Sequence, residues 1–316
     1  MKMKFIEDLK KELSKTNLNE SEIEEILNDF TEMVEEAVES GLLESDLEKK
    51  FGSPEKLAND LASEHASNEK TDTNTNNENT FEFVPEDNYN IVIELLNEDI
   101  EIETAQSNKI HIEARKVRRL KDYEIKFENN TLYIKKPRKQ YAEFFNFSRN
   151  SKFILKLPNQ YKVKDFNFSN INGDGLVKNI HADNIKFKVT NGDFDFQDNQ
   201  FGVIGIDTIN GDIKMKNMTS TQFKVSLVSG DMSLKDIAIT EGFNLSTVSG
   251  DIEVENFNCN QAFIRLVSGD FEGKEFYPNE ITIRTVSGDV DIKNTNKEKR
   301  IEVIKKSSVS GDININ

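Results

Sequence analysis

The segments Val228-Ser229-Gly230-Asp231 and Val248-Ser249-Gly250-Asp251 contain a motif made of a small polar residue, a glycine and an aspartate. The motif occurs eight times between Asn172 and the C-terminus, and successive glycines are 19, 19, 19, 20, 19, 19 and 23 residues apart. A fixed period near 20 residues, in units too small to bury their own apolar side chains, is typical of stacked-repeat proteins. The sequence therefore predicts a mainly β protein, a β-solenoid of about 19-residue coils.

Apolar residues alternate with other residues on both sides of each glycine. Before Gly230 these are Phe223, Val225 and Leu227, and the first residue after the aspartate is Met232. Alternation with a period of two indicates short strands with one buried face, and glycine permits the positive φ of a tight turn between them. We expect each coil to consist of a strand, a turn, a second strand and a return loop, with successive coils ~4.8 Å apart.

The motif places an aspartate at the same point of every coil. Stacked carboxylates would lie ~5 Å apart, which is unfavourable unless something compensates. Each could accept backbone N–H groups of its own or a neighbouring turn, or the row could hold cations, as in calcium-binding nonapeptide solenoids. We favour the structural role and expect no metal or other cofactor. The predicted turn residues are Gly173, Gly192, Gly211, Gly230, Gly250, Gly269, Gly288 and Gly311, with Asp174, Asp193, Asp212, Asp231, Asp251, Asp270, Asp289 and Asp312.

Residues 1–66 predict a small domain of three helices. Apolar side chains recur at helical spacing, as at Phe5, Leu9 and Leu13, and a serine before Pro54 is typical of a helix start. A core of about 66 residues is small, so its apolar stripe could equally meet a partner.

The two regions that follow differ in character. Residues 67–80 contain no large apolar side chain and predict a flexible polar linker. Residues 81–160 alternate as strands, and the segment from Leu95 to Ile102 resembles a degenerate repeat without its glycine. We therefore expect an irregular β capping region over 81–160 and solenoid repeats over 161–316.

The amino-acid composition limits which cellular compartment and which class of protein we expect. The chain has 316 residues, of which 36% are hydrophobic and 31% charged, and no segment approaches ~18 consecutive apolar residues. Its start is charged rather than signal-peptide-like, and the lone Cys259 excludes an internal disulfide. A cytoplasmic protein is the default expectation, with the cell surface by non-standard export as the alternative.

Charge is distributed unevenly along the chain. The net charge is −16; residues 1–66 hold 18 acidic and 8 basic side chains, net −10, whereas residues 115–139 hold 10 basic and 3 acidic ones, net +7. Such an asymmetry can join two parts of one chain or draw the basic part to an anionic surface.

Aromatic residues directly follow this basic stretch and suggest an interaction surface. One interpretation is a loop that meets anionic lipid, or less favourably a nucleic-acid strand. In the other, the rings close the first coil while the basic side chains protect an exposed strand edge. The candidate residues are Arg115, Lys116, Arg118, Arg119, Lys121, Tyr141, Phe144, Phe145 and Phe147.

The iterated Val-Ser-Gly-Asp units, preceded by Leu157-Pro158, resemble the bacterial "putative adhesin" β-strand-repeat family, which includes LiaX-type proteins of the cell-envelope stress response in Gram-positive bacteria. The segment Phe51-Gly52-Ser53-Pro54 resembles the HAAS domain, a helical signalling module found beside transcriptional regulators. These resemblances imply envelope-stress signalling and supply no catalytic residues.

Nothing else in the sequence indicates an enzyme. His65, His111 and His181 lie in different segments without metal-ligand spacing, and no nucleophile elbow, phosphate loop or dinucleotide motif occurs. We expect a non-enzymatic regulatory or scaffold protein whose helical module binds a regulator or sensor protein. The alternative is a surface-exposed, adhesin-like protein that captures cationic peptides or glycans. Self-association through an open C-terminal coil is a further expectation.

Overall fold

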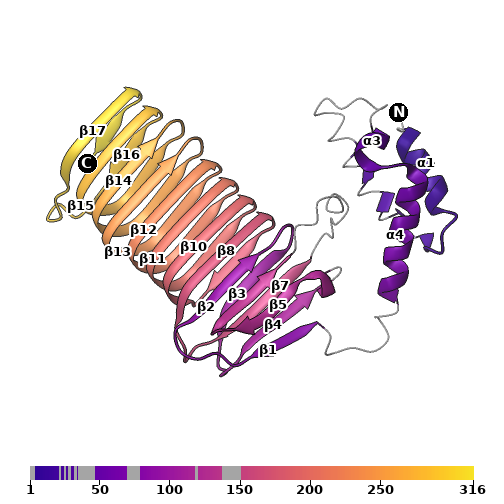
Figure 1. Ribbon diagram of the computed structural model, residues 1–316. Coiled ribbons are helices and arrows are strands. Elements are labelled where there is room, and N and C mark those ends of the chain that lie inside the picture. Colours follow the sequence, from indigo (N-terminus) through magenta and orange to yellow (C-terminus); the bar gives the residue numbers. More distant parts are fainter. Residues whose placement is uncertain are drawn as a thin grey trace. The chain divides into compact units, whose positions relative to one another are not determined.

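The structure is a computed structural model that describes residues 4–20, 47–69, 79–117, 120–136 and 151–316, together with isolated positions between residues 23 and 34 (Figure 1). The described chain divides into a helical unit and a β unit that begins at Asn79. Each unit has its own hydrophobic core.

The helical unit contains α1 (Lys4–Leu13), α3 (Leu47–Phe51) and α4 (Pro54–Glu69). Ser53 begins α4, since its Oγ accepts the N–H of Lys56 at 3.4 Å. Two details differ from expectation: α3 was not anticipated, and α4 continues beyond residue 66 because no glycine or proline interrupts it. The described positions between 23 and 34 are helical, and the unit's core consists of Phe5, Leu9, Leu13, Ile26, Phe30, Val34, Leu47, Phe51, Leu57, Ala58 and Leu61.

The regular coils of the β unit stack in parallel and in register, and Figure 1 shows their strands side by side up to β17. Phe194 pairs with Ile213, which pairs with Met232, and so on coil after coil. A β-solenoid is therefore confirmed. Its strands are β8 (Val163–Asn172), β9 (Gly175–Lys178), β10 (His181–Asn191), β11 (Phe194–Asn210), β12 (Ile213–Ser229), β13 (Met232–Thr247), β14 (Ile252–Leu266), β15 (Phe271–Ser287), β16 (Val290–Lys293), β17 (Glu302–Ser310) and β18 (Ile313–Ile315).

The expected return loop is wrong for most coils. From β11 to β15 the return remains β structure and bends at a single residue with left-handed backbone, such as Asp198 at φ 56° or Asn217 at φ 53°. Asn and Asp adopt this conformation more readily than other non-glycine residues because their short side chains hydrogen-bond locally. Strand pairing with the neighbouring coils on both sides of the bend then hydrogen-bonds the backbone of nearly the whole coil. The bends lie at Asn179, Asp198, Asn217, Asp236, Asn256 and Glu275. The last coil does have a return loop, residues 294–301, between β16 (Val290–Lys293) and β17 (Glu302–Ser310).

The glycine of each turn lies directly on the backbone of the coil before it. A Cβ at Gly250 would be 1.8 Å from the carbonyl oxygen of Gly230, and one at Gly230 would be 2.3 Å from that of Gly211. The φ of Gly250 is 128°, which strains any other L residue. Steric space and backbone conformation therefore both require glycine.

Phenylalanine fills the centre of the coils. The rings of Phe223, Phe243, Phe257 and Phe276 follow one another with centroid separations of 5.3, 4.8 and 5.3 Å. All four are completely buried. Each coil thus gains from its neighbours the apolar contacts that it is too thin to make alone.

The first coils do not stack in sequence order. Strands β2 and β3 pair in parallel with β8 and β9 on one side and with β6 and β7 on the other. In the stack, the segment with β2 and β3 therefore lies between the later segment with β6 and β7 and the first regular coil, which contains β8 and β9. Antiparallel strands close the end, because β5 pairs with β6, β4 with β7, and β1 with β4. These strands are β1 (Thr80–Phe83), β2 (Tyr89–Glu94), β3 (Asp99–Ala105), β4 (Ile110–Arg115), β5 (Glu124–Glu128), β6 (Thr131–Lys135) and β7 (Lys152–Pro158), with the short helix η2 (Leu120–Asp122) before β5.

A buried carboxylate holds this cap together. Glu98 lies where the regular turns have glycine, and only 3% of its surface is exposed. Its Oε1 accepts hydrogen bonds from the Tyr123 hydroxyl and from Lys136 Nζ, the latter at 2.8 Å, while its Oε2 accepts the N–H of Leu96 at 3.1 Å. Burial acts to raise the pKa of Glu98, but the Lys136 ammonium and these hydrogen bonds outweigh it and hold the pKa below the ordinary value.

We expect Gly250→Ala to lower the free energy of unfolding by about 2–4 kcal/mol, because strain at positive φ and overpacking each cost ~1–3 kcal/mol. Gly242→Ala is the control, since a Cβ there would meet nothing closer than 3.7 Å. Urea denaturation of the full chain measures both, and equal losses would contradict the turn geometry.

Lys136→Met should cost on the order of 3 kcal/mol at pH 7, because it leaves the Glu98 carboxylate buried without its partner. The lowered pKa of Glu98 means that the ion pair stabilises the fold above the ordinary carboxyl pKa, and that this contribution is lost as pH falls through the lower folded value. Without Lys136 burial instead raises the pKa of Glu98, so the deficit of the variant should shrink as pH falls toward about 4.

The matched control is Lys135→Met, whose ammonium lies 2.9 Å from the exposed Glu94 carboxylate. It should cost below about 1 kcal/mol. Urea denaturation at both pH values would reject the cap assignment if the two lysine variants behaved alike.

Candidate interaction surfaces

The turn edge carries a continuous row of aspartates. Oδ1 of Asp231 accepts the N–H of Asp251 at 2.8 Å, and the same bond recurs between every adjacent pair at 2.7–2.9 Å. The row begins one coil earlier than expected, because Asp99 accepts the N–H of Asp174. The sequence signal for Asp99 was its place in the degenerate repeat, which a search for the glycine motif passes over. The aspartate row is Asp99, Asp174, Asp193, Asp212, Asp231, Asp251, Asp270, Asp289 and Asp312.

A row of aliphatic side chains lies beside the aspartate row. It occupies the position two residues before each turn glycine, and its isoleucines and valines are 38% to 83% exposed. Backbone hydrogen bonds hold the register: Ser249 N–H donates to Val228 O at 2.9 Å, and Ser268 N–H to Val248 O at 2.8 Å. The aliphatic row is Ile171, Ile209, Val228, Val248, Val267, Val286 and Val309, and Thr190 takes this position in one coil. Most repeats contain this signal, since the turns from Gly192 to Gly288 are each preceded by two apolar or β-branched residues, of which only one can face the core.

The polar residue before each turn glycine forms a further ladder in the first coils. Asn172 Nδ2 donates to Asn97 Oδ1 at 2.7 Å, and Asn191 and Asn210 continue the chain of bonds at 2.7 and 2.8 Å. From Ser229 onward serine takes this position. Three ladders of different chemistry therefore run side by side along one edge.

Several side chains of the basic stretch form ion pairs. Arg115 forms a two-pronged pair with Glu113 at 2.7 and 3.0 Å, Lys126 lies 2.8 Å from Glu124, and Lys136 binds the buried Glu98. Arg118, Arg119, Arg138 and Lys139 lie outside the described residues, so the net charge of +7 over this stretch stays a count from the sequence.

The structure describes only some of the other candidate residues in this stretch. Lys116 has a left-handed backbone at φ 52°, and Lys121 is exposed on η2. The structure thus brings Arg115, Lys116 and Lys121 to the cap rather than to the turn edge. Arg118, Arg119, Tyr141, Phe144, Phe145 and Phe147 lie outside the described residues.

The histidines and the cysteine whose side chains the structure describes lie on three different strands. His111 is on β4 and His181 on β10, and the side chain of His65 in α4 is not among those described. Burial raises the pKa of the Cys259 thiol to about 12, so this sulfur is a poor nucleophile. Over the described residues, no group of three or more His, Cys, Asp or Glu side chains is arranged to hold a metal ion.

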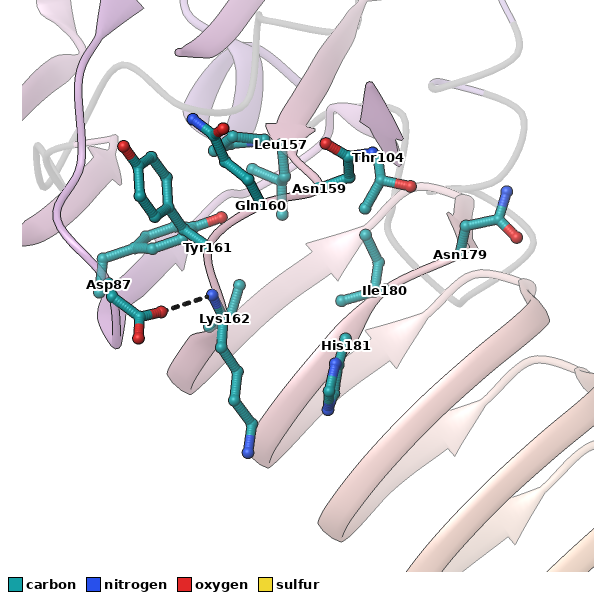
Figure 2. A pocket seen from close by; sticks show the side chains of 13 residues that line it. Asp87, Thr104, Leu157, Asn159, Gln160, Tyr161, Lys162, Asn179, Ile180 and His181 are labelled. Atoms are coloured by element: carbon teal, nitrogen blue, oxygen red, sulfur yellow. Dashed lines mark hydrogen bonds between the residues drawn. The ribbon is translucent and has the colours of Figure 1, made fainter. Parts of the chain in front are cut away.

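A pocket of ≈ 220 Å³ lies where the β7–β8 turn passes the bend between β9 and β10 (Figure 2). Sequence reasoning did not find it, because its walls come from β2, β3, the β7–β8 turn and β10, which are far apart in the chain. Among its lining residues are Asp87, Tyr89, Thr104, Asn159, Gln160, Tyr161, Lys162, Asn179 and His181.

Within the residues that the structure describes, none of the helices combines the length and apolar character needed to cross a membrane.

Comparison with known proteins identifies both units. The family model described as Toastrack DUF4097 matches residues 88–316, and the model described as HAAS matches residues 4–60. No curated protein matches the chain.

Solved structures resemble this chain at low sequence identity. One, named "putative lipid binding protein" from Parabacteroides distasonis, has a TM-score of 0.52 and 15% identity, covering 76% of this chain and 98% of its own. Another, named "putative adhesin" from Bacteroides fragilis, has a TM-score of 0.45 and 16% identity, covering 75% of this chain and 96% of its own. At 15% identity, the similarity to the first of these structures shows only a shared fold.

Asp231→Ala should lower the free energy of unfolding by about 1 kcal/mol, because the N–H of Asp251 loses its acceptor. Asp231→Asn keeps an acceptor oxygen and removes one of the stacked charges, so it should change stability by less than about 0.5 kcal/mol. Urea denaturation with and without calcium tests this. A large calcium-dependent rise in stability of the natural protein, absent in Asp231→Asn, would instead show that the row holds cations.

Proposed function

Because the chain belongs to the Toastrack DUF4097 family, we propose that it is a non-enzymatic scaffold protein of bacterial cell-envelope stress signalling. Its HAAS-like helical unit would bind a regulator or sensor protein, and its β unit would present the turn edge to a second partner. The expected resemblance to an adhesin-like β-repeat family with a HAAS-like region is confirmed. Kinship with LiaX-type proteins stays a prediction.

The observation that carries this proposal is the aliphatic row. Apolar side chains scattered singly on a surface are ordinary, but a contiguous apolar patch marks an interaction site. From Val228 to Val309 every coil contributes an exposed valine, at a spacing of ~4.8 Å. β-branched side chains on a rigid sheet lose little conformational freedom on binding, which favours association.

The negative charge beside the aliphatic row indicates what kind of side chains this partner would carry. The aspartate row runs parallel to the aliphatic row, three residues further along each coil. A complementary partner would place apolar side chains on the valines and basic side chains on the carboxylates. The helical unit has its own acidic surface, net −10 over residues 1–66, and can serve a different partner.

The same edge supports a second candidate function. An acidic rod with an apolar stripe is also suited to an adhesin-like protein that captures cationic peptides at the cell surface. Localisation separates the two: protease treatment of intact cells should digest the β unit only if it is displayed outside.

We expect a strain that lacks the gene to mount an altered transcriptional response to cell-wall antibiotics, and the full chain to restore it. The triple variant Val228→Thr, Val248→Thr and Val267→Thr keeps the β-branched shape and removes apolar surface, so it should fold normally and fail to restore the response. The control is Val203→Thr, an exposed valine away from the row.

A response that does not depend on the gene would overturn the signalling proposal. Full restoration by the triple variant would show instead that the aliphatic row is not the interaction surface. Equal melting temperatures of the variants and the natural protein establish that any defect is not one of folding.

A further inference from the structure

The outward side chains before and in the turns form three parallel rows of different chemistry. A basic stripe, Lys188, Arg265 and Arg284, lies two residues before the aliphatic row, and all three side chains are exposed. The aspartate row lies three residues beyond the aliphatic row. In one coil the three rows are therefore represented by Arg265, Val267 and Asp270. The turn edge is basic on one side of its apolar row and acidic on the other.

The basic stripe has no acidic partner within the part of the chain that the structure describes. Lys188, Arg265 and Arg284 form no ion pair or hydrogen bond with any described residue. Lysines past the turns differ, since Lys235 pairs with Glu255 at 2.8 Å. The strand register places Arg265 directly beside Arg284, and like charges at opposed positions of a sheet repel each other. An acidic group from outside the coil would compensate both arginines.

The aspartate row uses only one oxygen of each carboxylate for the stacking of the coils. Oδ1 of Asp270 accepts the N–H of Asp289 at 2.7 Å, and Oδ1 of Asp289 accepts the N–H of Asp312 at 2.8 Å. The Oδ2 atoms of Asp270 and Asp289 accept no hydrogen bond from a described residue. A guanidinium or ammonium group binds such an oxygen through a charge-assisted hydrogen bond. Both charged rows can therefore still take an opposite charge.

The order of the three rows makes the turn edge complementary to itself. A two-fold axis along the aliphatic row would place the valines of one copy on those of another, and the basic stripe of each on the aspartate row of the other. Arg265 would then face Asp270 of the second copy, and Arg284 would face Asp289. A two-fold axis across the rows would instead oppose aspartate to aspartate, which is unfavourable. Of the two, the parallel arrangement satisfies both charged rows.

We propose that the second partner of the turn edge is another copy of this chain, joined in a parallel dimer about the aliphatic row. This inference rests on the proposed function, because it names the occupant of the surface described there. The contact is ~14 Å wide and extends over seven steps of ~4.8 Å, which buries on the order of 1,000 Å² in total. Such an area is the lower limit of a specific interface, so the dissociation constant is on the order of 10 μM.

Sedimentation equilibrium of the full chain measures the dimer. Arg284→Asp replaces two attractive contacts of the symmetric interface with repulsive ones, so it should weaken the dimer at least about tenfold. Lys216→Asp is the matched control. It makes the same change of charge at an exposed side chain of β12 beyond the three rows, and it should keep the dissociation constant within about twofold.

A variant that strengthens the dimer guards against effects of misfolding. Asp207 is exposed and takes the place of the basic stripe in its own coil, where it faces Asp212 of the second copy. Asp207→Lys turns this repulsive contact into an attractive one and should lower the dissociation constant about fivefold.

Cysteines on the two-fold axis test the orientation of the two copies. In a parallel dimer every position of the aliphatic row meets the same position of the other copy. Val228→Cys and Val286→Cys should therefore each form an intermolecular disulfide under mild oxidation. Val203→Cys, exposed but away from the row, should not. The natural Cys259 is buried and should not react.

A folded chain that stays monomeric at ~100 μM would overturn the inference. So would an Arg284→Asp variant that dimerises like Lys216→Asp, or a disulfide at only one of Val228→Cys and Val286→Cys, which indicates antiparallel copies. The proposed function fails separately. A monomer whose triple valine variant cannot restore the stress response loses only the dimer, whereas a dimer in a strain whose response does not depend on the gene loses only the signalling role.

Discussion

The close approach of each turn to the turn before it is the constraint on which the β unit depends. The carbonyl oxygen of one glycine occupies the space that a Cβ of the next would need, as at Gly230 and Gly250. The neighbouring aspartate then bonds the backbone of the following coil. With this contact fixed, extra residues must be accommodated away from the turn. One is absorbed as a bulge between Ala238 and Gly242, and the 23-residue last coil places its extra residues between β16 and β17.

Exact stacking converts each position of the repeat into a ladder. Phe223 and Phe243 stack inside, Val228 and Val248 form a row outside, and the aspartates form another. A single favourable residue in the repeat is thereby multiplied into an extended surface ~5 Å per step. The proposed interaction edge is thus a consequence of the same geometry that stabilises the rod.

The cap is held by different contacts from the regular coils, because one side of it has no further coil to pair with. Antiparallel strands terminate the sheet. Glu98 lies at the position that glycine has in the regular turns, and its carboxylate accepts hydrogen bonds from Tyr123 and Lys136. The pocket beside β2 lies in this region of altered strand order. Several of the described basic side chains of this region are paired, as Arg115 is with Glu113.

The repeat class, the period, the position of the turns and the helical start at Pro54 are all properties of the sequence alone, because each depends on local residue types and spacing. The left-handed bends at residues such as Asp198 were missed because Asn and Asp at that position look like ordinary loop residues. The out-of-order coil, the Glu98 cap and the pocket at Tyr89 were decided only by tertiary structure. Each brings together residues tens of positions apart, Asp99 and Asp174 for example, and no periodic pattern records which distant segments will pair.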